Sequence, residues 1–92
     1  MQINFQNQIA IVTGAAHGFG RAIALAFAER GAFVWGCDVL TDELQETQRL
    51  CEATGGRCEV RTVDVSQRDA VFAFVDEVHQ AQGRIHTLVN NA

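Results

Sequence analysis

The stretch from Thr13 to Gly20, with the sequence Thr-Gly-Ala-Ala-His-Gly-Phe-Gly, constrains this chain more than any other feature. It follows the apolar run Ile9–Val12, which is typical of a buried strand, and it precedes a helical pattern over residues 21–30. The N–H groups of a first helical turn have no partner within the helix, and the helix dipole adds positive potential at the same end. A strand, a glycine turn and a helix in this order therefore predict a binding site for a phosphate group.

The three glycines of this stretch have distinct expected roles. Gly14 allows a sharp turn out of the strand, Gly18 leaves room for a diphosphate, and Gly20 allows the helix to lie close to the sheet. A glycine triplet alone also occurs in ordinary turns, but the flanking strand and helix favour a dinucleotide site. From Thr13 to Gly20 the sequence matches the cofactor motif T-G-x-x-x-G-x-G at every position, and the chain resembles the short-chain dehydrogenase/reductase family here.

Strand and helix patterns alternate along the whole chain. Strands are expected at residues 9–13, 33–37, 58–63 and 87–90, and helices at residues 18–30, 41–54 and 67–82. Ile23, Ala26 and Phe27 are expected to form the buried stripe of the first helix. Thr41 and Ser66 are the expected N-caps of the second and third helices.

Strands that alternate with helices imply a parallel sheet with right-handed crossovers. We therefore expect an α/β fold, a Rossmann-type parallel sheet with helices on both faces and the strand order 3-2-1-4, which is half of a doubly wound domain. The first two helices should cover one face and the third helix the other. The crevice above the carboxyl ends of strands one and four, where the direction of winding reverses, is the expected ligand site.

Asp38, at the end of the second expected strand, is the next candidate for cofactor binding. A carboxylate there can accept hydrogen bonds from both hydroxyls of the adenine ribose and would repel a 2′-phosphate, whereas the alternative is an ordinary turn aspartate. In the family that this chain resembles, NADP-dependent members often carry a basic residue at the positions that His17 and Val39 occupy here. Neither residue has a fixed positive charge, although a protonated His17 would supply one at low pH. The sequence therefore favours NAD over NADP.

Two further segments carry the resemblance. Asp64-Val65 matches a family position whose carboxylate reaches the adenine amino group and whose next N–H reaches a ring nitrogen, although an aspartate before Ser66 is also ordinary helix-entry chemistry. Asn90-Asn91-Ala92 resembles the start of the N-N-A-G motif, which holds the adenosine end of the cofactor. The resemblance implies this set of cofactor-binding residues: Gly14, Ala16, His17, Gly18, Phe19, Gly20, Asp38, Val39, Asp64, Val65, Asn90, Asn91 and Ala92.

The chain contains no tyrosine, no lysine and a single serine, Ser66. Catalysis in the family uses a Ser, a Tyr-x-x-x-Lys pair and a further Asn, in which Tyr exchanges the alcohol proton and Lys lowers its pKa. Ser66 lies in the wrong place, so no catalytic residue can be assigned in this chain. Residues 1–92 are therefore expected to be the N-terminal part of a single Rossmann dinucleotide-binding domain, truncated after the fourth strand.

Composition argues against several other classes of function. A net charge of −4 without a basic tract disfavours nucleic acid and anionic membranes as partners. No apolar run approaches a membrane span, and residues 1–4 lack a signal-peptide pattern, so a cytoplasmic location is expected. The three cysteines have no C-x-x-C spacing and the three histidines are scattered, which disfavours a metal site.

The resemblance implies the cofactor-binding half of an NAD-dependent oxidoreductase that exchanges a hydride between nicotinamide and a secondary alcohol or ketone. It is shared with 3-oxoacyl-carrier-protein reductases and sugar-alcohol dehydrogenases, and it implies a homo-oligomer, either a dimer or a tetramer. The alternative is a free-standing nucleotide-binding or assembly module without catalysis. A methyltransferase is a third reading, which the glycine spacing and Asn90-Asn91-Ala92 argue against. In the family the substrate-binding residues lie in the second half of the domain, so these residues do not specify the substrate.

Overall fold

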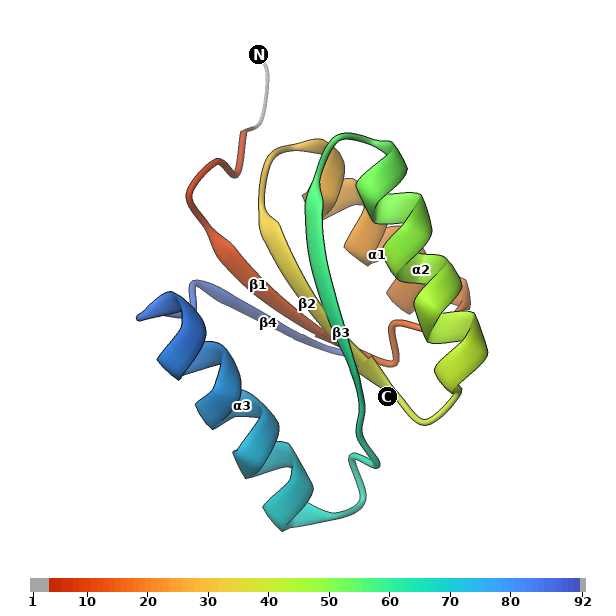
Figure 1. The fold of residues 1–92 in the computed structure, drawn as a ribbon, viewed down its shortest axis with the longest axis vertical. Helices are drawn as coiled ribbons and strands as arrows, with labels where there is room; N and C mark the ends of the chain where they lie inside the picture. The colour runs from red at the N-terminus through yellow and green to blue at the C-terminus, as the bar shows by residue number, and fades with distance from the viewer. Residues whose placement is uncertain (1–3, 92) are drawn as a thin grey trace.

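The computed structural model describes residues 4–91, which form one four-stranded sheet and three helices (Figure 1). In chain order the elements are β1 (Ile9–Thr13), α1 (Gly18–Glu29), β2 (Phe33–Asp38), α2 (Thr41–Ala53), β3 (Arg57–Thr62), α3 (Arg68–Gln82) and β4 (Thr87–Asn90). Neighbouring strands pair in parallel in the order β3-β2-β1-β4. The predicted Rossmann-type fold and strand order are confirmed.

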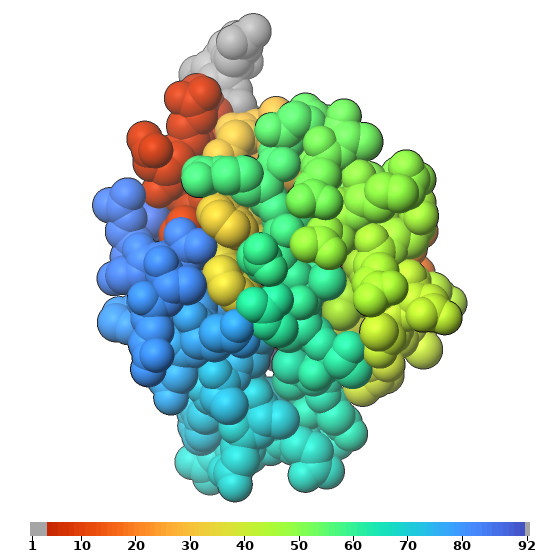
Figure 2. All heavy atoms as spheres, viewed as in Figure 1, coloured from red at the N-terminus to blue at the C-terminus, as the bar shows by residue number. Residues whose placement is uncertain are grey.

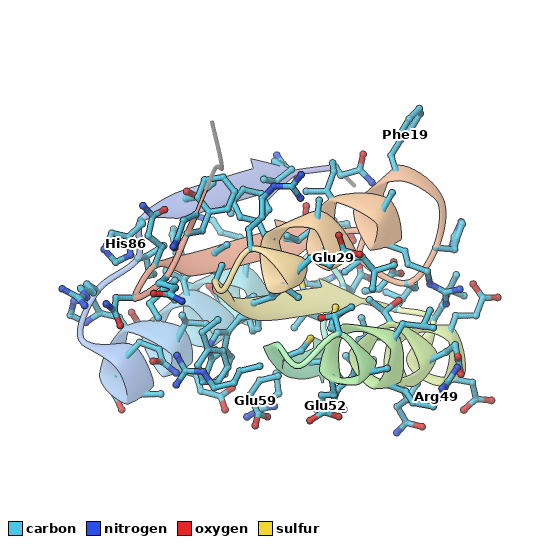
Figure 3. The ribbon with its side chains drawn as sticks, turned by 90° about the horizontal axis from the view of Figure 1, so that it is seen from above. Phe19, Glu29, Arg49, Glu52, Glu59 and His86 are labelled. Atoms are coloured by element: carbon cyan, nitrogen blue, oxygen red, sulfur yellow. The ribbon has the colours of Figure 1, made fainter. Side chains whose placement is uncertain are left out.

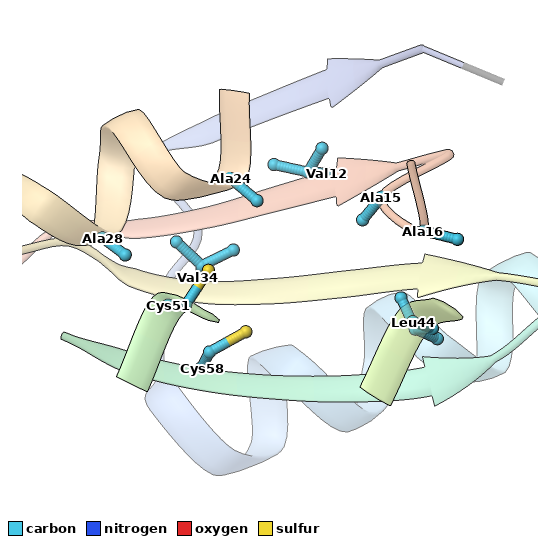
Figure 4. Close-up of a cluster of buried hydrophobic side chains, with 9 residues drawn as sticks. All are labelled: Val12, Ala15, Ala16, Ala24, Ala28, Val34, Leu44, Cys51 and Cys58. Carbon is cyan, nitrogen blue, oxygen red and sulfur yellow. The ribbon is translucent and has the colours of Figure 1, made fainter. Parts of the chain in front are cut away.

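Helices α1 and α2 cover one face of the sheet and α3 covers the other (Figure 1). Because successive strand residues point to opposite faces, Val12 and Val34 belong to the core beneath α1 and α2 (Figure 4), whereas Ile11 and Trp35 pack beneath α3. All five residues of β1 are buried, as expected for a strand covered on both faces. This central strand carries the glycine-rich stretch to the carboxyl edge of the sheet.

Small residues form the buried face of α1. Gly20, Ala24 and Ala28 are buried, whereas Ile23 and Phe27 are half-buried and pack at the margin of the core. The predicted stripe is therefore wrong by one position along the helix. Small side chains therefore form the contact between α1 and the core, and the larger residues flank this contact.

Ser66 does not cap α3, contrary to the prediction. The helix begins at Arg68, and its N-cap residue, Gln67, makes no side-chain capping bond. The Ser66 hydroxyl instead donates to Oδ1 of Asp64 at 2.7 Å. A local turn at the end of β3 therefore uses the hydroxyl that the sequence pattern assigned to the helix.

Thr41 is also displaced from its predicted role, because it is the first residue within α2 and Leu40 is the N-cap. The Thr41 hydroxyl lies 3.0 Å from the hydroxyl of Thr62 on β3 and makes no capping bond. The end of α3 agrees with the sequence, since Gly83 adopts the left-handed conformation with a φ of 79°.

Arg61 of β3 joins the edge of the sheet to α3. Its guanidinium lies 5.2 Å from the centre of the Trp35 ring and donates to the carboxylate of Glu77 at 2.7 Å. Figure 2 shows side chains of β2 and β3 at the surface between α3 and α2. Arg61 therefore covers part of this open strip of the sheet with a cation–π contact and an ion pair.

Candidate functional site

The glycine loop, residues 13–20, leaves the carboxyl end of β1 and leads into α1 (Figure 1). Gly14 and Gly18 have positive φ angles of 64° and 59°, as a tight glycine turn requires. A Cβ atom on Gly18 would meet no atom within 4 Å, so the space beside this residue is open. The first turn of α1 contains no acidic residue, so no side chain there neutralises the positive end of the helix dipole.

Gly20 has a role that differs from its predicted contact with the sheet. A Cβ atom at this position would lie 1.8 Å from the carbonyl oxygen of Gly14 and 3.0 Å from Nδ2 of Asn91. The missing side chain therefore makes room for the loop's own backbone and for the residue after β4. Gly20 determines how tightly the loop folds back on α1.

Asp38 links the end of β2 to the glycine loop. Its Oδ2 atom accepts a hydrogen bond from the N–H of Ala16 at 3.0 Å. Its Oδ1 atom accepts from the N–H groups of Val39 at 2.7 Å and Leu40 at 3.3 Å. These three donors fix the carboxylate in one orientation, and its two oxygens retain further acceptor capacity.

Thr13 holds the end of β4 against the glycine loop. Its hydroxyl donates to Oδ1 of Asn90 at 3.0 Å and accepts from the backbone N–H of Asn91 at 3.0 Å. The first residue of the motif therefore orients both asparagines of the Asn90-Asn91 segment.

A cavity of about 380 Å³ opens at the carboxyl edge of the sheet between the loop, β2, β3 and the end of β4. Its lining residues are Gly14, His17, Gly18, Phe19, Asp38, Val39, Val63, Asp64, Val65 and Asn91. Most of the residues that the sequence assigned to cofactor binding are thus brought together from four separate segments. Val63 was not singled out from the sequence, and its only signal was its place before Asp64.

Of the predicted residues that the structure describes, three are not part of this lining. Ala16 is fully buried and contributes its backbone N–H to Asp38, while Gly20 is buried beneath the loop. Asn90 lines a neighbouring cavity instead. Ala92 lies outside the described residues.

Asp64 is exposed and lies at the mouth of the cavity. Its Oδ1 atom accepts from the Ser66 hydroxyl at 2.7 Å and from the Ser66 N–H at 3.0 Å. These two hydrogen bonds, the hydroxyl bond foremost, lower the pKa of the Asp64 carboxyl below its usual range. Asp64 therefore presents a negative charge to the cavity.

The glycine-loop side of the cavity combines an exposed apolar side chain with a histidine–carboxylate contact. Phe19 is 82% exposed and projects away from the loop (Figure 3). His17 lies 3.2 Å, from Nδ1 to Oε2, from Glu43 in the first turn of α2. The sequence offered no signal for this pairing, which sets a carboxylate beside the only histidine of the loop.

The neighbouring cavity, of about 290 Å³, lies between the sheet and α3. It is mostly apolar and includes the buried thiol of Cys37. Burial, together with the nearby Asp38 charge, raises the pKa of that thiol to about 11, so it is protonated at neutral pH and a poor nucleophile.

Within residues 4–91, no group of three or more His, Cys, Asp or Glu side chains is arranged to hold a metal ion. None of the helices in this described part is both long and apolar enough to span a bilayer.

Comparison with known proteins places this geometry in a family. The family model for short chain dehydrogenase matches residues 8–92. A putative oxidoreductase of Mycobacterium tuberculosis, SadH, is 40% identical over 89 residues, which are 97% of this chain and 32% of that protein. The chain therefore spans about a third of the length of this curated relative.

Solved structures agree with the sequence match. A metagenomic short-chain oxidoreductase in complex with NADP has a TM-score of 0.93 and 40% identity, over 96% of this chain and 40% of its own. A short chain dehydrogenase/reductase from Burkholderia phymatum in complex with NAD has a TM-score of 0.87 and 33% identity. The match covers 95% of this chain and 31% of that protein's chain.

Gly20→Ala tests the close approach of the loop to α1. Alanine has the better helix propensity by about 1 kcal/mol, so an unhindered substitution would stabilise the protein. Overlap with the Gly14 carbonyl should instead lower the free energy of unfolding by about 1–3 kcal/mol, measured by urea denaturation. The control is Ala22→Gly at an exposed position of the same helix, where the change in stability reflects only the difference in helix propensity between alanine and glycine. Stabilisation by Gly20→Ala would contradict this account.

Ser66→Ala should raise the pKa of Asp64 toward its usual value, because the variant loses the hydroxyl donor and keeps the backbone donor. A lowered carboxyl pKa contributes stability above the pKa of the unfolded state, and that contribution is lost as pH falls through the folded pKa. In the variant, the Asp64 carboxyl should therefore contribute less to the loss of folding stability at acid pH. Carboxyl-carbon NMR titration measures the pKa, and Ser66→Thr, which keeps the hydroxyl, is the control. An unchanged pKa in Ser66→Ala would exclude the hydroxyl as the cause.

Proposed function

This chain belongs to the short-chain dehydrogenase family, and we propose that residues 1–92 form the N-terminal, dinucleotide-binding part of an NAD-dependent oxidoreductase. The observation that carries the proposal is the single cavity that joins the glycine loop to Asp38, Asp64 and Asn91. The adenine ring, the adenine ribose and the diphosphate of a dinucleotide require different chemistry, and this cavity offers a separate group for each.

The residues of the cavity fit a dinucleotide. The glycine loop would hold the diphosphate, since Gly18 leaves the backbone open and the start of α1 supplies the positive end of a helix dipole. Asp38 would accept from the hydroxyls of the adenine ribose, and its orientation is already held by Ala16. Asp64 and the N–H of Val65 would contact the adenine ring, whereas the Asn90-Asn91-Ala92 segment would hold the adenosine side.

The charges around the ribose end favour NAD over NADP. Asp38 would face a 2′-phosphate with a like charge, and Val39 beside it offers no positive charge. Glu43 pairs with His17, so any positive charge on that histidine is offset by a carboxylate 3.2 Å away. Because one of the two solved relatives holds NADP and the other NAD, the preference proposed here rests on these side chains.

The proposed reaction of the whole protein exchanges a hydride between nicotinamide and a secondary alcohol or ketone. The bound cofactor supplies the hydride chemistry, and these 92 residues supply binding and orientation. With no Tyr or Lys in this sequence, the proton donor to the carbonyl oxygen would come from another part of the protein. By the family resemblance, the proposal extends to a cytoplasmic homo-oligomer, a dimer or a tetramer, that acts on a small molecule.

Asp38→Asn tests the cofactor assignment in the full-length protein. Asparagine keeps the size and one acceptor oxygen but removes the charge, so the ratio of NAD affinity to NADP affinity should fall about tenfold or more. Calorimetric titration of both cofactors measures this ratio. Asp42→Asn, at an α2 position outside the cavity, should leave the ratio unchanged.

Three outcomes would contradict the proposal. Equal affinity of the unmodified protein for NAD and NADP would remove the proposed preference. If S-adenosylmethionine competed with NAD for the site and bound with the higher affinity, the result would favour a methyltransferase. Tight NAD binding by the full-length protein, without turnover of any ketone or secondary alcohol in a broad panel, would favour the non-catalytic module.

Residues 1–92 alone should be inactive, because they contain no group that can protonate a carbonyl oxygen in the manner of the family tyrosine. The measurement is NADH oxidation with a panel of ketones, compared between the purified fragment and the full-length protein. Turnover by the fragment above the buffer rate, free of contaminating enzyme, would require a catalytic group outside the proposed mechanism.

A further inference from the structure

We propose that Thr47 of α2 is a positioning residue that holds the glycine loop in its cofactor-binding shape, an inference that rests on the proposed function. Thr47 is fully buried and lies 31–32 residues from the loop carbonyls that it contacts. It does not line the cavity, so it would act only through the loop.

The Thr47 hydroxyl joins α2 to the inner side of the loop. Its Oγ1 atom lies 2.8 Å from the carbonyl oxygen of Ala15 and 3.2 Å from that of Ala16. Both alanines are fully buried, so water cannot replace this donor without opening the structure. The single proton of the hydroxyl is therefore available to either of these two buried carbonyl groups.

Arg21 determines the direction in which the Thr47 hydroxyl donates. The Nε atom of Arg21 lies 2.9 Å from Oγ1 of Thr47, and a guanidinium can only donate. Oγ1 must therefore accept from Arg21, and its single proton remains for a carbonyl. The carbonyl oxygen of Glu43 lies 3.3 Å from Oγ1 of Thr47 and is a competing acceptor for the threonine proton. The Nη2 atom of Arg21 donates to this same oxygen at 2.8 Å and so occupies it.

The loop is thus held on two sides by different elements. The N–H groups of Ala15 and Ala16 donate to the Cys37 carbonyl and the Asp38 carboxylate of β2. The carbonyl groups of the same two residues face Thr47 of α2. Because a trans peptide sets its N–H opposite to its C=O, the Ala16 carbonyl directs the next N–H away from α2. Loss of the Thr47 hydroxyl would release the peptide groups that lead into the phosphate-binding turn.

The test compares two substitutions of Thr47 in the full-length protein. Thr47→Val keeps the shape and removes the hydroxyl, whereas Thr47→Ser keeps the hydroxyl and removes a methyl group. Thr54→Val is the matched control, because Thr54 is the C-cap residue of α2 and its hydroxyl donates to the Cys51 carbonyl of the same helix. NAD affinity is measured by calorimetry, fold by circular dichroism, and KM for NAD and kcat with a ketone substrate by steady-state kinetics.

Thr47→Val should weaken NAD binding about tenfold or more and raise KM for NAD, with little change in kcat at saturating NAD. Thr47→Ser should restore affinity to within about threefold of the unmodified protein, and Thr54→Val should bind as the unmodified protein does. A variant that is only less stable would lose active fraction and apparent kcat while its KM for NAD stayed the same. The KM effect therefore separates positioning from a merely structural role.

Two results would overturn the inference: NAD affinity unchanged in folded Thr47→Val, or a loss in Thr47→Ser as large as in Thr47→Val. If Thr47→Val does not fold, Arg21→Met decides, because it removes the donor that orients the hydroxyl and should weaken NAD binding at least threefold. Unchanged affinity in Arg21→Met would then overturn the inference. Failure of the unmodified protein to bind either NAD or NADP would instead contradict the proposed function itself.

Discussion

The structure depends on the close packing of the glycine loop against its own helix and the neighbouring strand. The carbonyl oxygen of Gly14 occupies the space that a Cβ on Gly20 would need, and a Cβ on Gly36 of β2 would lie 3.0 Å from the side chain of Ala15. Because glycine has no side chain at either position, the loop can pack closely between α1 and β2. Because protein interiors tolerate little extra volume, this packing fixes the loop backbone, and with it the edge of the cavity.

The same packing makes structure and binding share one set of groups. The Asp38 carboxylate secures the loop through Ala16 and also faces the cavity as the proposed partner of the ribose. Thr13 joins β1 to β4 while it orients Asn91 into the cavity wall. A site built in this way is organised before any ligand arrives, which lowers the entropy lost on binding. It also means that a substitution at Asp38 affects both the loop and the charge, so isosteric variants are the informative ones.

Parallel topology explains why these groups meet. All four strands run in one direction, so the ends of β1, β2 and β4 and the segment after β3 gather at one edge of the sheet. Helix α2 covers the same face of the sheet as α1. It places Thr47 against the Ala15 carbonyl of the loop and Glu43 beside His17. The proposed cofactor site is therefore supported by a second layer of side chains that do not line it, as preorganised sites require.

The sequence alone determined the features that depend on near neighbours along the chain: the alternation of strands and helices, the glycine turn between β1 and α1, and an acid at the end of β2. Right-handed crossovers and the family motif extended these to the strand order. Tertiary structure alone decided which side chains become partners across the fold. Sequence patterns assigned Ser66 to a helix cap and placed the buried stripe of α1 one residue away from Ala24, and they did not indicate that Thr47 holds the loop. The physical reason is that a hydroxyl or a helix face takes the best partner in space, and those partners come from segments that only folding brings together.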